Sequence, residues 1–372
     1  VEGVSLRQTE GFGVRVLVDG AWGFASSGHM NSPEADRIAA LAVRIARASA
    51  RHSARPVILD DRPTAAGRYE TPLQEDPFEV PVDETVDLLL DAERAMAAVP
   101  GTTTTSAAYE AFREAKDFYA SDGSRTEQVI THVGAGLQVH AAGDDELQRR
   151  SYPESGGYRA AGYEHVRALD LVARAPELAE EAVALLAAPV LPPGRRTVIL
   201  HPSQLYLQIH ESCGHPTELD RVFGTEAAYA GTSFLTTDKL EEGYAYGSEL
   251  VTLTADATTP GGLGTFGWDD EGVAAQRVPL IENGRLSGYL SSRETAPRIG
   301  RSSGGAVRAD GFDRLPLIRM TNINLEPRAG MSLDDIIADT DDGLLFMSNR
   351  SWSIDDRRLN FQFGVELARE IK

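Results

Sequence analysis

The sequence predicts an α+β protein of two domains: a mixed α/β domain over residues 1–190, and a β-rich domain over residues 191–372 that carries the helix with the candidate metal ligands. Helical and strand-like periodicities both occur in the first half, and strand-like stretches dominate the second. Between them, the proline-rich stretch Ala188–Gly194 stops any helix, so we place the domain boundary there. The 372 residues, 42% of them hydrophobic, can bury a large core.

The first domain begins with a β-hairpin. Gly13–Val18 and Ala21–Ser26 alternate around Asp19-Gly20, a dipeptide typical of two-residue hairpin turns. Ser32-Pro33 then predicts the start of a helix that continues to Ala50.

The rest of this domain is predicted to mix both element types. We expect helices over Val86–Ala98 and Ser106–Ala115, strands over Gln128–Val133 and Gly136–Ala141, and a helical stretch over Ala160–Ala188.

The second domain is predicted to be mostly β structure. We expect strands over Val251–Ala255, Arg277–Ile281, Leu286–Ser291, Leu344–Ser348 and Asn360–Val365. Asn283-Gly284 predicts a tight turn between the second and third of these. Ser332 and Asp335 predict a capped short helix through Ile337.

Two histidines and a glutamate concentrate the potential metal chemistry of the chain. His210, Glu211 and His215 lie within six positions, on a predicted strand-to-helix unit made of Arg196–His201 and Ser203–Cys213, with Ser203 as the N-cap. Histidines five apart would point about 140° away from each other on a regular α-helix. We therefore expect the helix to unwind between the two imidazoles, with Gly214 in an irregular conformation and His215 folding back toward His210.

This spacing favours a zinc-dependent hydrolase in which Glu211 acts as the general base. The alternative is a chance pattern, which arises in roughly one protein of this length in a hundred. Cys213 could bind zinc or act as a nucleophile, but a buried, unreactive thiol is favoured by about two to one. His201 is more typical of a structural imidazole or one that supports a ligand.

Two other clusters are weaker candidates. The glycine-rich run Gly261–Trp268 lacks the strand-loop-helix order of a phosphate-binding loop, so a mobile loop or a substrate-facing backbone is favoured. The carboxylates of Trp268–Glu271 and Ser353–Asp356 could hold Ca²⁺ or Mg²⁺, but their spacing favours solvated turns.

The charge and cysteine content limit the partners and the compartment. A net charge of −20 without a basic stripe argues against nucleic acid and anionic membranes as ligands. No apolar run approaches the roughly 20 residues that a membrane-spanning helix needs. One cysteine and the absence of a signal-peptide pattern favour a cytoplasmic location.

Longer motifs resemble those of a known family. The run HESCGHPTELDRVFGTEAAYAGTSF from His210 to Phe234 closely resembles the TldD branch of the TldD/PmbA (TldE) family. The resemblance also covers the stretches 262–272, 279–296, 319–327 and 349–364, together with VRVLVDGAWGFASS and QRRSYP in the first domain, so it extends over effectively the whole chain.

The resemblance implies a zinc metallopeptidase that cuts small or unfolded peptides and works as a heterodimer with a TldE/PmbA-like subunit. His210 and His215 then become zinc ligands and Glu211 the catalytic glutamate. The family completes its zinc site with a cysteine from a glycine-rich C-terminal segment. We expect that segment beyond Lys372, so that residues 191–372 form an incomplete metallopeptidase domain. Two alternatives remain: a tailoring enzyme acting on an amide or C–N bond of a biosynthetic intermediate, and a non-catalytic scaffold subunit.

Overall fold

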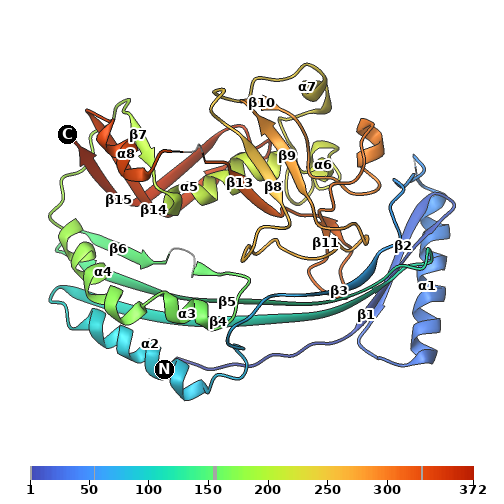
Figure 1. Cartoon of the computed structure of the whole chain (residues 1–372), viewed down its shortest axis with the longest axis horizontal. Coiled ribbons are helices and arrows are strands. Elements are labelled where there is room, and N and C mark those ends of the chain that lie inside the picture. Colours follow the sequence, from blue (N-terminus) through green and yellow to red (C-terminus); the bar gives the residue numbers. More distant parts are fainter. Residues whose placement is uncertain (1, 54, 154–156, 328–329) are drawn as a thin grey trace.

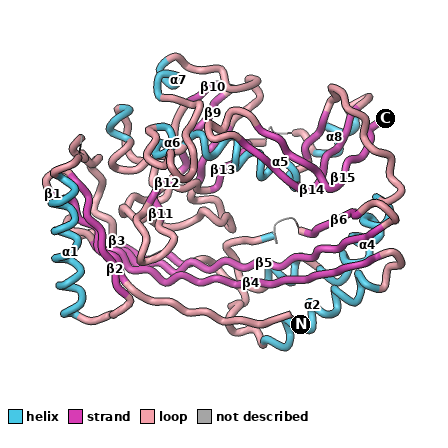
Figure 2. The backbone as a smooth tube through the Cα atoms, turned by 180° about the vertical axis from the view of Figure 1, so that it is seen from behind, coloured by secondary structure: helices cyan, strands magenta, loops and turns pink. Residues whose placement is uncertain are grey.

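The computed structural model describes residues 2–53, 55–153, 157–327 and 330–372. Its architecture is α+β, as predicted: long strands run along the molecule, helices cover them near one end, and the C-terminal half lies on the other side of the strands (Figure 1). The first hairpin and its helix stand at the opposite end (Figures 1 and 2).

The N-terminal hairpin and helix are confirmed. Strands β1 (Phe12–Val18) and β2 (Ala21–Ser27) pair antiparallel, and α1 (Ser32–Ala50) packs against them. Asp19 and Gly20 both have positive φ, as a two-residue hairpin turn of this kind requires. Asn31, one residue earlier than predicted, caps the helix by accepting a hydrogen bond from the N–H of Glu34.

The central part is built on two strands of eighteen residues each. Its elements are β3 (Ala66–Glu70), α2 (Val82–Ala97), β4 (Thr102–Tyr119), β5 (Arg125–Ala142) and β6 (Leu147–Tyr152). In the sheet, β5 pairs with β4 and β6 antiparallel and with β3 parallel.

The predicted helix over Ser106–Ala115 is wrong. This segment lies in β4, paired with β5 along almost its whole length. Its Ala, Glu and Arg residues favour a helix locally. In the structure, Ala107, Tyr109 and Ala111 alternate toward the core beneath α2. Their burial and the pairing with β5 outweigh the local helix propensity.

Two other predictions in this part need correction. The two strands expected at Gln128–Val133 and Gly136–Ala141 form one uninterrupted strand, β5. The helical stretch expected at Ala160–Ala188 is two helices, α3 (Glu164–Ala168) and α4 (Leu171–Leu185), because Asp170 between them has a φ of +50°. Helices α2 and α4 pack on β4 and β5 around the first hydrophobic core.

The C-terminal half contains mostly short strands and helices around a second core, and two longer strands that pack in a separate, smaller cluster. Its helices are α5 (Pro202–Gln208), η2 (Ile209–Gly214), η3 (His215–Thr217), α6 (Leu219–Val222), α7 (Thr237–Glu241), η4 (Ala296–Ile299) and α8 (Leu333–Ala338). Its strands are β7 (Val198–Leu200), β8 (Leu253–Asp256), β9 (Arg277–Glu282), β10 (Arg285–Leu286), β11 (Val307–Arg308), β12 (Leu317–Ile318), β13 (Asn322–Leu325), β14 (Gly343–Ile354) and β15 (Phe361–Ile371).

These strands form sheets in the orders β10-β9-β8-β13, β15-β14-β7 and β11-β12. The turn at Asn283-Gly284 and the capping box of α8 are confirmed. The strand predicted over Leu286–Ser291 ends at Leu286, because Ser287 and Gly288 both turn their N–H groups to the Leu280 carbonyl.

The carboxylates of Trp268–Glu271 join the two halves, so the predicted solvated turn is wrong here. Asp269 is buried and accepts the N–H groups of Glu271, Val273 and Val307. Glu271 pairs with Arg15 of β1, and Asp270 pairs with Lys116 of β4.

The glycine-rich run Gly261–Trp268 packs closely on neighbouring backbone. A Cβ atom on Gly264 would lie 2.5 Å from the carbonyl carbon of Thr321, and the Gly267 N–H donates to Gln128 of β5. Gly264 therefore allows close packing within the second half. Gly267, where a Cβ atom would lie 2.7 Å from the Tyr69 Cβ of β3, allows close packing against the first half.

Among the described residues, no helix has both the length and the apolar character needed to cross a membrane.

Candidate metal centre

A single π-helical turn places the two histidines, which are five residues apart, on the same side of the helix. The segment η2 follows α5 directly, and the N–H of His215 donates to the carbonyl of His210, five residues earlier. This wider turn brings residues five apart to the same side of the helix. The two ring centroids lie 4.7 Å apart with an interplanar angle of 84°.

The predicted unwinding of the helix between the two histidines is therefore wrong. The chain stays helical through both histidines, and Gly214 has ordinary right-handed dihedral angles, φ −73° and ψ −64°. Glycine is needed there for space, because a Cβ atom would lie 2.0 Å from the buried Met320 sulfur and 3.2 Å from Ile323 Cγ1.

This contact predicts the effect of Gly214→Ala. We expect it to lower the free energy of unfolding by about 1–3 kcal/mol, the usual cost of overpacking. Urea denaturation tests this, with Gly28→Ala as the control, because the nearest atom to a Cβ there lies at 3.5 Å. Combining Gly214→Ala with Met320→Ala should cost less than the sum of the single changes; strict additivity would contradict the proposed clash.

The structure brings the three predicted site residues together. His210, Glu211 and His215 each offer one nitrogen or oxygen atom, and these atoms all lie within 4.8 Å of one another. Glu211 and His215 are buried, while His210 reaches the surface. The atoms packed around the His210 ring, together with the adjacent His215 ring, lower its pKa to about 4, which keeps the imidazole neutral and free to bind a metal at neutral pH.

A buried carboxylate fixes the orientation of His215. Its Nδ1 lies 2.8 Å from Oε2 of Glu218, which is completely buried and also receives a hydrogen bond from Nε of Arg221. Although burial raises it, the pKa of Glu218 lies below its ordinary value because of the bond from His215 and the nearby charges. With Nδ1 bonded to the carboxylate, Nε2 of His215 is the nitrogen left for a metal.

An arginine from a distant part of the chain contacts Glu211. Nη1 of Arg358 donates to Glu211 Oε2 at 2.7 Å, and both side chains are largely buried. Neither Glu218 nor Arg358 was among the predicted site residues. The spacing of His215 and Glu218 on a helical segment could have suggested the first contact, whereas no local pattern points to the second.

Cys213 and His201 lie outside this group. The Tyr246 hydroxyl lies 3.1 Å from Cys213 Sγ, and burial raises the pKa of this thiol. The cysteine is partly buried and packs against the second core, as a small hydrophobic residue does. His201 caps α5 by accepting the N–H of Ser203, so the predicted N-cap at Ser203 is wrong and His201 has a structural role.

Asp220, close to Glu218, predicts a pH effect on stability. Burial raises its pKa to about 6, although it accepts the N–H of Ile318. Between about pH 4 and 6 the folded state holds a proton that the unfolded chain has released, so this group's contribution to stability decreases as the pH rises, by roughly 3 kcal/mol. Asp220→Asn should remove this part of the pH dependence in urea denaturation. Equal pH profiles for the variant and the wild type would contradict the assignment.

Three profiles of one family match the chain. The PmbA/TldA metallopeptidase domain 1 matches residues 1–46, its central domain residues 75–188, and its C-terminal domain residues 193–372. A metalloprotease of Methanocaldococcus jannaschii is 31% identical over 365 residues, which cover 98% of this chain and 77% of that protein. The chain belongs to the PmbA/TldD family.

One more distant relative and two solved structures are also similar to this chain. A zinc metalloprotease TldD homolog of Saccharolobus solfataricus is 28% identical over 46% of this chain and 36% of its own length. Among solved structures, a proposed modulator of DNA gyrase from Thermotoga maritima has a TM-score of 0.70 at 20% identity, covering 91% of this chain and 72% of its own. TldE from Thermococcus kodakarensis has a TM-score of 0.61 at 19% identity, covering 96% and 77%. These two structures show the shared fold.

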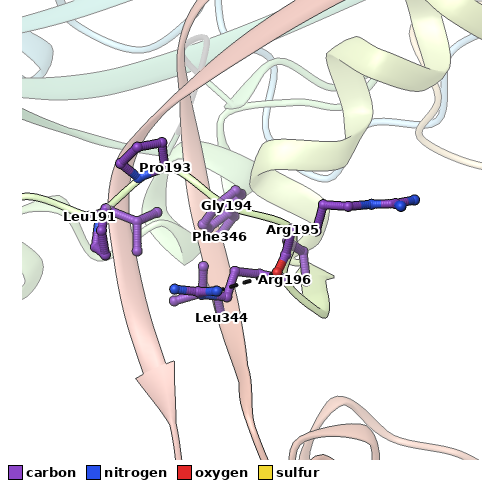
Figure 3. Close-up of a pocket in the computed structure, with 9 residues that line it drawn as sticks. Leu191, Pro193, Gly194, Arg195, Arg196, Leu344 and Phe346 are labelled. Carbon is purple, nitrogen blue, oxygen red and sulfur yellow. Dashed lines mark hydrogen bonds between the residues drawn. The ribbon is translucent and has the colours of Figure 1, made fainter.

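A cavity of about 470 Å³ in this PmbA/TldD chain is lined by residues other than the candidate metal ligands. It is lined by the segment 191–196, Val198, Leu344 and Phe346, next to the start of β7 (Figure 3). None of its lining residues belongs to the group of His210, Glu211 and His215. The cavity therefore does not include the candidate metal centre.

Proposed function

We propose that this chain is the metal-binding subunit of a zinc-dependent peptidase that cleaves small or unfolded peptides. The observation that carries the proposal is the cluster of His210, Glu211 and His215, whose potential ligand atoms lie within 4.8 Å. The names of the relatives support peptidase chemistry, and one of those names includes zinc.

The donor set suits zinc. Imidazole nitrogens are common zinc ligands. The lowered pKa of His210 keeps its ring neutral, and Glu218 orients the ring of His215. His210 and His215 would hold the ion, and the family resemblance implies a cysteine as the third ligand. A bound zinc ion polarises the scissile carbonyl and acidifies a water molecule.

The residues of the chain supply the proton transfers. Glu211 takes a proton from the attacking water and then delivers it to the leaving amine. Glu218 keeps the proton of His215 on Nδ1, and the contacts with His215 and Arg221 hold the pKa of Glu218 below its ordinary value. The same arrangement would also serve amide chemistry on a small biosynthetic intermediate, so substrate screening has to include both classes.

A TldE/PmbA-like subunit is the proposed partner, supported by the structural similarity to TldE and by the family assignment. The test is to purify the full-length protein alone and with such a subunit, and then to measure zinc content and cleavage of unfolded peptides. We expect one zinc per chain and cleavage that depends on the partner. Absence of bound zinc would overturn the proposal and favour the scaffold alternative.

A further inference from the structure

We propose that Arg358 is a positioning residue for Glu211. The turn between β14 and β15 places Arg358 beside the metal centre. This inference rests on the proposed role of Glu211 as the general base. Arg358 lies 147 residues from Glu211 in the sequence, and three features of the structure connect them.

The first feature is a rigid turn. The Asp355 carboxylate accepts the N–H groups of Arg357, Leu359 and Asn360 and the Asn360 side-chain amide. Arg358, at the tip, has a φ of +62°, a conformation that is costly for a residue other than glycine, and its N–H donates to the Asp355 carbonyl. The Asp355 carboxylate therefore stabilises this turn, which sets the direction of the Arg358 side chain.

The second feature is the docking of this turn next to the metal centre. The N–H of Thr232 donates to the Asp356 carbonyl at 2.7 Å, and the N–H of Phe234 donates to the Arg357 carbonyl at 2.9 Å. Gly231 has a φ of +77°, and a Cβ atom there would lie 2.3 Å from the Asp356 oxygen. The two backbones can approach this closely because residue 231 is glycine.

The third feature is the different environment of the two carboxylate oxygens of Glu211. Arg358 holds Oε2 through Nη1 and uses Nη2 to bond the Ala230 carbonyl at 3.0 Å. Among the residues that the structure describes, Oε1 has no hydrogen-bond partner, so it is the oxygen available to a substrate water. The Ala230 carbonyl also accepts Nη1 of Arg221, which in turn holds Glu218.

This geometry allows Arg358, but not the adjacent Arg357, to hold the Glu211 carboxylate. A guanidinium bonds two acceptors in a fixed plane, whereas a lysine at the same position supplies only a point charge. Removing the guanidinium leaves Glu211 free to rotate away from the attacking water, and a displacement of about 1 Å can cost roughly 100-fold in rate. Arg357 lies in the same turn, but its side chain is exposed.

The test compares Arg358→Ala, Arg358→Lys and, as the matched control, Arg357→Ala in the full-length zinc-loaded protein with its partner. The probe is a fluorescence-quenched peptide of unstructured sequence that the wild type cleaves. We expect Arg358→Ala to lower kcat about 10- to 100-fold with KM and zinc content unchanged. Arg358→Lys should recover part of this loss, and Arg357→Ala should match the wild type. Unchanged kcat in Arg358→Ala, or zinc loss parallel to the kcat loss, overturns the inference.

Ethylguanidinium provides a readout that does not depend on activity. It should bind the space left in Arg358→Ala and raise its Tm, and this stabilisation should be absent in the double variant Arg358→Ala, Glu211→Gln. Stabilisation of both variants alike contradicts the pairing. If Arg358→Ala fails to fold, Arg358→Lys decides the question through its kcat. Full activity of Glu211→Gln would be a separate result. It would show that Glu211 is not the general base, and so would overturn the proposed function.

Discussion

Glu211→Gln should lower the rate of peptide cleavage by about 10³-fold while zinc remains bound at one ion per chain. General acid–base catalysis typically contributes 10²- to 10⁴-fold, and an amide can neither take the proton from water nor deliver it to the leaving amine. Because the Gln oxygen can still accept the hydrogen bond from Arg358, the fold should be retained. Steady-state kinetics and metal analysis of the same sample measure both quantities.

The control for this experiment is Glu241→Gln, at the exposed end of α7. It makes the same chemical change far from the metal centre in sequence and should leave the rate unaltered. Cleavage by Glu211→Gln at more than a tenth of the wild-type rate would argue that another group serves as the base.

His215→Ala should abolish stoichiometric zinc binding, and with it cleavage. It removes one of two imidazoles whose rings lie 4.7 Å apart, whereas the Glu218–Arg221 pair that stabilises the surrounding helix remains. Dialysis against a zinc chelator, followed by metal analysis, measures the loss. His52→Ala, which changes an exposed histidine, is the matched control.

Glu218→Gln should produce a graded version of the same effect. Partners that orient a metal ligand typically change metal affinity by 10- to 100-fold, so this variant should bind zinc more weakly than the wild type and more tightly than His215→Ala. The reverse order of affinities would contradict the proposed role of His215.

The sequence is informative wherever one local cause determines a structure. Asp19-Gly20 and Asn283-Gly284 have positive φ because their turns demand it, and both turns are predictable from the dipeptides alone. The cluster of two histidines and a glutamate is predictable too, because all three residues lie on one short segment. The π-helical turn is not, because an interruption of the helix is the simpler way to bring residues five apart together.

Features that depend on distant contacts could not be predicted. Ser106–Ala115 has the composition of a helix, and its strand conformation follows from pairing with β5. Arg358 reaches Glu211 only because the turn after β14 docks on the segment 230–234. Such contacts have no local periodicity, so the pattern of neighbouring residues cannot reveal them.

The most direct test of the metal centre is anomalous diffraction at the zinc absorption edge, using crystals of the full-length protein. We predict one zinc peak between the rings of His210 and His215, with a nitrogen of each ring about 2.0–2.1 Å from the ion and Glu211 beside it. A stoichiometric zinc ion located elsewhere, or bound to only one of these rings, would contradict the account.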